Sequence, residues 1–256
     1  MKQSVIAKAS RINFLNAPID ALSMSETLKK IEEFVHSKRP HQHMAVNVAK
    51  IVNLHQDQAL YDSVVQSDLI NADGLPIVWA ARFLGKVIPE RVAGIDLMQE
   101  LIKLSAEKGY RPYFLGAKEE VVKAVVEIAQ KKYPALQVAG YTNGYCFQNG
   151  GERKIVENIK NSRADILFVA LGSPQKEIFI KKYLQEMQVP FCMGVGGSFD
   201  VVAGVTKRAP RWMQKSGLEW FYRFIQEPRR MWKRYLVTNS LFIYYVLKEK
   251  IRLVCL

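Results

Sequence analysis

The chain has 256 residues, 49% of them hydrophobic and 24% charged, which is typical of a globular protein and excludes a disordered chain. Its net charge of +13 is uneven, because residues 205–256 hold 12 Lys and Arg against 3 Asp and Glu. This cationic end predicts a polyanionic partner: nucleic acid, an anionic lipid surface or a phosphorylated substrate. Residues 1–20 lack the apolar stretch of a signal peptide, and residues 241–247 are too few to cross a bilayer. We therefore expect a protein that stays inside the cell and meets membranes only peripherally.

Strand patterns alternate with helical patterns over residues 1–204. Apolar, β-branched runs predict buried strands at residues 43–47, 67–72, 110–117, 136–141, 164–172 and 189–197. Apolar residues spaced three and four apart predict amphipathic helices at residues 25–38, 118–134 and 173–187. This alternation predicts an α/β fold, a mostly parallel Rossmann-like sheet with helices on both faces.

Residues 205–256 follow a different pattern, and we expect them to form a separate, basic helical appendage to an α/β catalytic domain of residues 1–204. Pro210 and Pro228 mark helix starts in this segment. Its aromatic residues alternate with Arg and Lys. Such a pattern suits base stacking, a helix in a membrane interface, or simple packing on the main domain. Composition alone leaves these three alternatives open.

Cysteine and histidine give little indication of chemistry. Cys146, Cys192 and Cys255 have no metal-ligand spacing and are expected to be reduced, buried thiols. The four histidines, which lack a zinc-binding spacing, are expected to be structural or exposed: His36, His41, His43 and His55. The chain has no DxD motif, so we expect no metal and no other cofactor.

Polar residues and glycines follow the predicted strands, where ligands of parallel α/β sheets bind. Asn47, Asp73, Gly116, Gly172 and Gly197 all lie at or just after a strand end. Two interpretations stay open for Asp73, which either caps the next helix or faces a ligand. Arg91, in the loop that precedes a helix near Asp96, is either a surface charge or a bidentate phosphate clamp.

Two further segments are candidates for ligand binding. In residues 170–180, Pro174 opens a helix whose free amides can hold an anion, with Lys176 in its first turn. In GVGGSFD, residues 194–200, the glycines allow a ligand to approach the backbone, and Asp200 can accept hydrogen bonds from a ribose or a base. The alternative for this second segment is a tight turn capped by Asp200.

Several motifs occur together in a fixed order. They are ADG at 72–74, RVAGIDL at 91–97, YFLGA at 113–117, GSPxxE at 172–177, GVGGSFD at 194–200, and RAPRW with GLEWFYRFIQEPRRMWKRY between 208 and 235. The set resembles the WecG/TagA/CpsF family of bacterial glycosyltransferases over nearly the whole chain. The resemblance implies inverting transfer of a sugar, N-acetylmannosamine or a related hexose, from a UDP-sugar to a prenyl-diphosphate-linked amino sugar. The reaction would take place at the cytoplasmic face of the membrane, in teichoic acid or other surface polysaccharide synthesis.

The resemblance also implies roles for individual residues. Asp73 matches the general base, and Arg91 matches an arginine that contacts the diphosphate. Asn47 and Asp200 resemble residues of the nucleotide pocket, to which we add the backbone at Gly116 and Gly197. Arg223 and Arg230 resemble arginines that close over the donor, while the tail helices dock on anionic lipid. Self-association through the tail aromatics is a further expectation, and no nucleic-acid partner is expected.

Two positions depart from the family pattern. Relatives often carry Thr where this chain has Ala45, and an amide where it has Lys176, whose cation can help to neutralise the leaving diphosphate. Two other functions compete with sugar transfer. A nicotinamide-dependent oxidoreductase would share the sheet, but the GxGxxG turn is missing after the first strand. A nucleic-acid binder would use the basic tail.

Overall fold

The structure is a computed structural model that describes residues 11–145 and 151–255, except for the side chains of residues 230, 233 and 234. Within these residues, six strands form one parallel sheet in the order β4-β3-β8-β7-β5-β6. The strands are β3 (His41–Val46), β4 (Leu69–Ala72), β5 (Pro112–Gly116), β6 (Gly140–Thr142), β7 (Ile166–Ala170) and β8 (Phe191–Gly194). The α/β prediction is confirmed, and each predicted strand overlaps an observed one.

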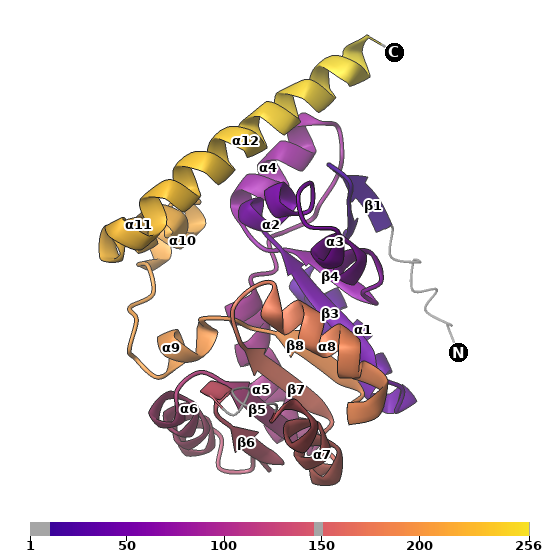
Figure 1. The fold of residues 1–256 in the computed structure, drawn as a ribbon, viewed down its shortest axis with the longest axis vertical. Helices are drawn as coiled ribbons and strands as arrows, with labels where there is room; N and C mark the ends of the chain where they lie inside the picture. The colour runs from indigo at the N-terminus through magenta and orange to yellow at the C-terminus, as the bar shows by residue number, and fades with distance from the viewer. Residues whose placement is uncertain (1–10, 146–150, 256) are drawn as a thin grey trace, which may run out of the picture.

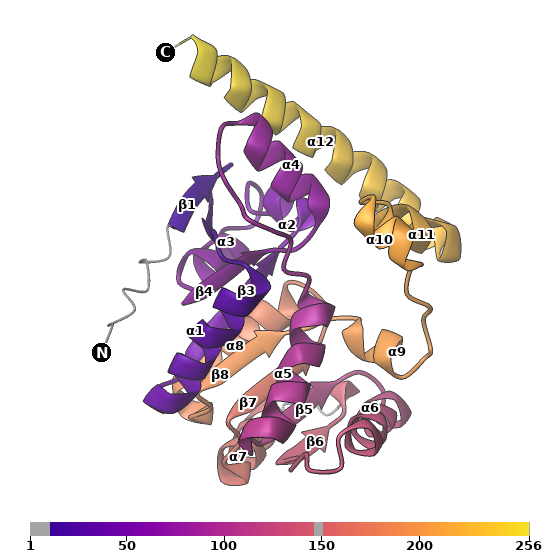
Figure 2. The ribbon, with the colours of Figure 1, turned by 180° about the vertical axis from the view of Figure 1, so that it is seen from behind.

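Helices cover both faces of the sheet. On one face lie α1 (Met24–Ser37), α5 (Gly94–Lys108) and α6 (Glu119–Lys132), as Figure 2 shows. On the other lie α3 (Gln58–Val65), α7 (Glu152–Ser162) and α8 (Gln175–Met187) (Figure 1). The three predicted helices are therefore confirmed as α1, α6 and α8. Shorter helices follow three strand ends: α2 (Val48–Asn53), α4 (Leu75–Phe83) and α9 (Ser198–Val202).

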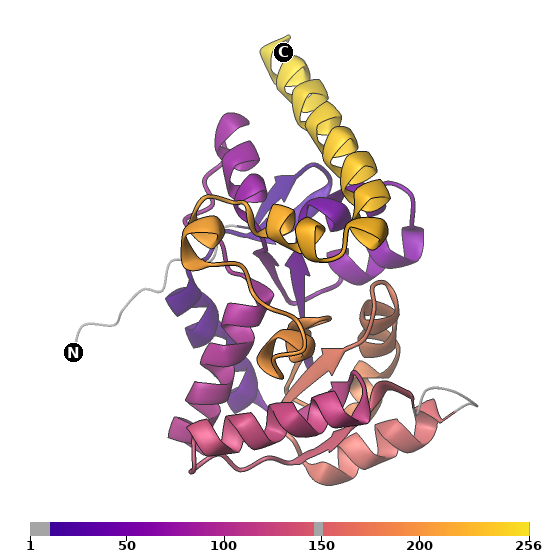
Figure 3. The ribbon, with the colours of Figure 1, turned by 90° about the vertical axis from the view of Figure 1, so that its left-hand side faces the viewer.

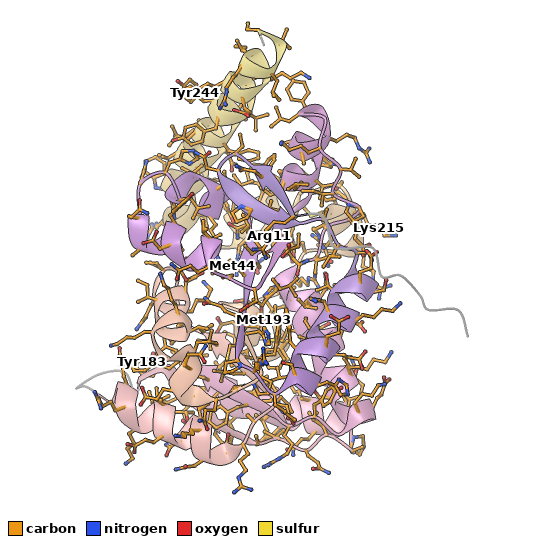
Figure 4. The ribbon with its side chains drawn as sticks, turned by 90° about the vertical axis from the view of Figure 1, so that its right-hand side faces the viewer. Arg11, Met44, Tyr183, Met193, Lys215 and Tyr244 are labelled. Atoms are coloured by element: carbon orange, nitrogen blue, oxygen red, sulfur yellow. The ribbon has the colours of Figure 1, made fainter. Side chains whose placement is uncertain are left out.

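The core lies between the sheet and its two helix layers. Phe114, Phe168, Phe191 and Phe199 are fully buried beneath the α1, α5 and α6 layer. Their burial fixes the sheet as a rigid platform, because removing one such ring costs about 3–5 kcal/mol. Figure 4 marks Met44 of β3 and Met193 of β8 near the centre of this platform.

An antiparallel hairpin precedes the sheet, and no element is predicted there from the sequence. It consists of β1 (Arg11–Phe14) and β2 (Ala17–Asp20). Asp20 forms an ion pair of 2.8 Å with Arg11 and accepts a hydrogen bond of 2.8 Å from the backbone N–H of Ile70. The hairpin thus covers β4, an edge strand whose free amides would otherwise invite pairing.

The basic tail folds as three helices: α10 (Arg211–Lys215), α11 (Glu219–Gln226) and α12 (Pro228–Val254). Pro210 caps α10 and Pro228 begins α12, so both predicted helix starts are confirmed. An extended segment joins α9 to α10 (Figure 1), and α12 packs on α2. Phe242 and Val246 of α12 are buried in the cluster that contains Phe14. The division at residue 204 stays a prediction. Among the described residues, no helix has the length and apolarity needed to span a membrane.

The cysteines only partly match expectation. Cys192 is buried, and burial raises the pKa of its thiol. Cys255 is exposed at the end of α12, so the expectation of burial is wrong there, because the last turn of the helix extends beyond the core. Cys146 lies outside the described residues.

The histidines have structural contacts. His43 hydrogen-bonds Asn71 at 3.0 Å in the core, and burial lowers its pKa to about 4. His36, His41 and His55 bond backbone carbonyls through a ring nitrogen.

Candidate functional site

The predicted site residues gather at the carboxyl edge of the sheet. Asn47 follows β3, Asp73 follows β4 and Gly197 follows β8, and these three strands are neighbours in the order β4-β3-β8. Figure 3 shows α9, α10 and α11 on the side of the molecule where these strands end. The structure therefore brings together residues that are about 150 positions apart in the sequence, as the parallel topology requires.

Asp73 is held by the backbone on both sides. Its N–H donates to the carbonyl of Val46 at 2.8 Å, and Gly74 turns the chain with φ +128° before α4 begins. The N-cap of α4 is Gly74, and no side chain caps this helix, so the capping interpretation of Asp73 is wrong. Its carboxylate is partly buried, and this burial raises the pKa of Asp73 to about 6, although the charge of Arg91 opposes the rise.

Arg91 lies beside Asp73 because the next residue, Val92, donates its N–H to the carbonyl of Ala72 at the end of β4. The guanidinium of Arg91 is 15% exposed, which rules out the interpretation as a solvated surface charge. It donates from Nη1 to Glu219 of α11 at 2.9 Å and from Nη2 to Asp96 of α5 at 3.4 Å. The two hydrogen bonds leave other guanidinium N–H groups for a ligand.

A second charged cluster lies under the helices that follow β3 and β7. The Nζ atoms of Lys50 and Lys176 approach the same oxygen, Oε1 of Glu177, at 2.8 and 2.9 Å. All three side chains are nearly buried, and among the residues that the structure describes the Oε2 atom of Glu177 has no hydrogen-bond partner. Burial alone would raise the pKa of Glu177, but the two lysine charges outweigh it and lower the pKa to about 2.

Lys176 therefore contacts the buried Glu177, and its predicted contact with the substrate stays a prediction. A Cβ built on Gly194 would lie 2.9 Å from the aliphatic stem of Lys176, so this stem fills the space beside the glycine. Asn47 caps α2 by accepting the N–H of Lys50 at 3.0 Å. Within the described part of the chain, the side-chain amide of Asn47 has no other partner, so it can donate to a ligand.

The glycine loop meets the tail at Arg223. A Cβ built on Gly197 would lie 3.0 Å from Nη2 of Arg223 and 3.7 Å from Oδ2 of Asp200, so the three residues are adjacent. Asp200 lies inside α9, whose N-cap is Gly197 without any side-chain bond, and so the interpretation of Asp200 as a cap is wrong. The side chain of Arg230 lies outside the described residues.

Gly116 serves the fold. With φ +112°, a Cβ at this residue would lie 2.4 Å from the carbonyl oxygen of Ala170 on the neighbouring strand β7. The close approach of two backbones therefore explains this glycine. Its contact with a ligand stays a prediction.

Sequence reasoning missed two residues that contact the predicted ones, Lys50 and Glu219. For both residues the sequence contains a pattern that could have identified them. Lys50 is three residues after Asn47, the spacing of a helix N-cap and its amide partner. Glu219 is an isolated acid in a segment with 12 cations, which is itself a sign of a specific pairing.

Comparison with known proteins identifies the family of this chain. Residues 12–255 match the glycosyl transferase WecG/TagA/CpsF family. A Bacillus subtilis (strain 168) protein named N-acetylglucosaminyldiphosphoundecaprenol N-acetyl-beta-D-mannosaminyltransferase is 38% identical over 196 residues, 76% of this chain and 74% of its own length. A Staphylococcus aureus (strain MW2) protein of the same name is 30% identical over 246 residues, 95% of each chain.

The family match covers the strand-end loops and the tail together. It favours sugar transfer over the two competing predictions, an oxidoreductase and a nucleic-acid binder. The chain therefore belongs to the WecG/TagA/CpsF family of glycosyltransferases.

Proposed function

We propose that this chain transfers N-acetylmannosamine, or a closely related hexose, from its UDP derivative to N-acetylglucosamine linked through a diphosphate to a prenol. The relatives' names supply the sugar and the acceptor. The observation that carries the proposal is the position of Asp73 within the electrostatic reach of Arg91 at the carboxyl edge of the sheet, where Arg91 contacts the cationic tail through Glu219. Such a transfer would serve teichoic acid or another surface polysaccharide.

Asp73 acts as the general base. A carboxylate whose pKa is about 6 is ionised at pH 7 and is still basic enough to remove a proton in the transition state. It takes the proton of the acceptor hydroxyl, and the hydroxyl oxygen attacks the anomeric carbon of the donor. The bond from that carbon to the diphosphate breaks, and its electron pair leaves on UDP. A single displacement of this kind inverts the anomeric configuration.

Cationic side chains hold the charge that develops on UDP. Arg91 lies beside the end of β4, Arg223 lies against Gly197 after β8, and Arg230 is in the first turn of α12, the helix after that of Arg223. Arginine suits this task, because its planar fork binds phosphate oxygens in pairs. Among the described residues no three acidic, His or Cys side chains gather as metal ligands. We infer that the arginines do the work that a divalent metal does in other transferases.

The tail supports docking on an anionic membrane. Its outer surface exposes large apolar side chains, among them Trp212 (64%), Trp232 (54%), Leu236 (64%) and Ile251 (64%). Figure 4 marks Tyr244, another of these residues, on α12 at one end of the molecule. Apolar and aromatic groups interleaved with Lys and Arg fit the interface of a bilayer with anionic lipid. A peripheral position on the cytoplasmic leaflet would bring the site to a prenyl-linked acceptor. Self-association through the same side chains stays a prediction.

Release of UDP tests the proposal. The full chain is incubated with a panel of UDP-sugars, detergent-solubilised prenyl-diphosphate-N-acetylglucosamine and EDTA. We expect acceptor-dependent release of UDP from one donor, undiminished by EDTA. Absence of release from every donor in the presence of lipid would contradict sugar transfer, and release abolished by EDTA would contradict only the metal-free mechanism.

A further inference from the structure

Four charged side chains form a closed ring at the junction of the tail and the α/β part. Arg91 contacts Glu219 at 2.9 Å and Asp96 at 3.4 Å. Arg208, which precedes α10, contacts Glu219 at 3.3 Å and Asp96 at 2.6 and 2.9 Å. Each arginine thus bridges both carboxylates, and opposite charges alternate around the ring. Two members come from the α/β part, and two come from the tail.

The ring is partly shielded from water. The exposed fractions of its side chains are 15% for Arg91, 21% for Arg208, 34% for Asp96 and 35% for Glu219. Ion pairs in such a setting are screened less than surface pairs, and guanidinium groups with two partners have a defined orientation. The ring therefore specifies where the guanidinium of Arg91 lies, which an exposed pair would not do.

We propose that Glu219 is a positioning residue of the site, which reaches the ring with the docked tail, fixes Arg91 beside Asp73 and completes the charge surroundings of that carboxylate. Arg208 holds Glu219 in turn, and Asp96 holds Arg208. The inference rests on the proposed function, since it assigns a role in the same reaction. Its consequence is that the base is correctly tuned only while the tail is in place.

The charges that act on Asp73 have opposing effects. Burial has the largest effect and raises the pKa of Asp73. The charges of Arg91 and Lys50 lower this pKa, and those of Glu219 and Asp96 raise it. In Glu219→Gln the side-chain carbonyl can still accept the hydrogen bond of Arg91, so Arg91 keeps its place while an anion that disfavours ionisation of Asp73 is deleted. Loss of this anion lowers the pKa of Asp73.

Glu219→Gln tests the proposal with two measurements. In the first, kcat/KM is measured against pH, and we expect its acid limb to move to lower pH. We also expect kcat at pH 8 to fall about three- to tenfold, because a less basic carboxylate removes protons less effectively. The second measurement needs no substrate. The eight Asp residues are labelled with ¹³C at the carboxyl carbon, and the Asp73 signal is identified by its loss in Asp73→Asn. Its titration midpoint should also fall.

Two further variants separate positioning from simple anchoring. Met213→Ala removes a buried contact of α10 and keeps all four charges of the ring, so it should lower the free energy of unfolding while the docked molecule keeps the midpoint of Asp73 where it is. Glu219→Asp retains the charge and should restore most of the midpoint. An Asp73 midpoint in Glu219→Gln equal to that of the wild type would overturn the inference, whatever the loss of activity. If the wild type transfers no sugar, the proposed function fails, while the titration still decides the role of Glu219.

Discussion

The two halves of the candidate site are held by different forces. In the α/β half, backbone hydrogen bonds place Asp73 and Arg91 directly against the ends of β3 and β4. In the tail half, Glu219 and Arg223 are brought to the site by side-chain ion pairs and by the packing of α12 on α2. The difference teaches that the proposed base is fixed by the fold, whereas the groups proposed to tune it and to hold the charge of the leaving diphosphate depend on a docked tail.

The surfaces of the two regions differ in the same sense. The α/β part exposes apolar side chains singly, as at Ile128 (42%) and Ile178 (41%), or as the short pair Trp79 (51%) and Phe83 (49%) on α4, which is ordinary for a globular protein. The tail exposes a run of them along α10, α11 and α12. Patches of this kind mark interaction sites, so the tail packs on the α/β part on one side and is proposed to meet lipid on the other.

Asp73→Asn is the sharpest test of the α/β half. The amide has nearly the same shape but cannot accept a proton, so kcat should fall about 10²- to 10⁴-fold. The thermal unfolding midpoint should stay at or above that of the wild type, because the substitution removes a partly buried charge. A variant that keeps more than a tenth of the wild-type turnover would show that another group is the base.

The dependence of the wild-type activity on pH tests the same role of Asp73. Asp73 works when ionised, and its pKa is raised to about 6, so activity should be lost as pH falls through about 6. An unperturbed aspartate would keep the enzyme active down to about pH 4. Stability should show the opposite sign. A raised carboxyl pKa means that the charged form costs folding energy, and this cost fades as pH falls from about 6 to about 4, where the carboxyl of the unfolded chain is protonated as well.

Glu177→Gln should have the next largest effect, and it acts on stability. The substitution leaves Lys50 and Lys176 without the carboxylate that both contact, and loss of one partner of a buried pair costs about 3 kcal/mol. Urea unfolding monitored by circular dichroism measures the loss. Because the folded pKa of Glu177 is about 2, its contribution is present above about pH 4.5 and fades as pH falls towards 2.

Lys176→Gln is the matched control for this cluster, since Glu177 keeps its contact with Lys50. We expect a loss of free energy of unfolding smaller than that in Glu177→Gln. A larger loss in Lys176→Gln would contradict the view that Glu177 is the centre of the cluster.

A double substitution, Trp232→Ser with Leu236→Ser, addresses the tail half. Both side chains are more than half exposed on α12, one turn apart. Burial of one such group in lipid contributes about 1.5–3 kcal/mol, so the affinity for phosphatidylglycerol vesicles should fall at least tenfold. The matched control, Ile128→Ser with Ile178→Ser, removes apolar surface from α6 and α8 and should leave vesicle binding unchanged. Equal losses in the two variants would mean that the tail has no special role.

The α/β half was the more predictable from sequence. Strand runs, the position of Asp73 after one of them, and the helix starts at Pro210 and Pro228 all follow from local patterns. The hairpin of residues 11–20 was missed because each strand has only four residues, too few for a clear alternation.

The tail contacts of the site could not be predicted in the same way. That Glu219 would meet Arg91, 128 positions earlier, depends on how α12 packs on α2, and no local pattern encodes it. Lys176 illustrates a second limit. Its place in the first turn of α8 was read correctly, but whether it faces a ligand or the buried Glu177 depends on the tertiary position of Lys50.

Glycine substitutions give the smallest expected effect and the most direct contrast between the halves. In Gly197→Ala, the new methyl would lie 3.0 Å from Nη2 of Arg223, the mobile end of a long tail side chain, and φ is negative. We expect a change of less than threefold in the KM for the donor, because Arg223 can move by a few tenths of an ångström.

In Gly116→Ala, the methyl would meet the backbone of Ala170 at 2.4 Å with φ +112°. The free energy of unfolding should fall there by about 2–3 kcal/mol, because neither backbone can yield. A severe loss of donor binding in Gly197→Ala with an intact fold would show instead that Arg223 is held as rigidly as the backbone, and the contrast between a fixed half and an adjustable half would not hold.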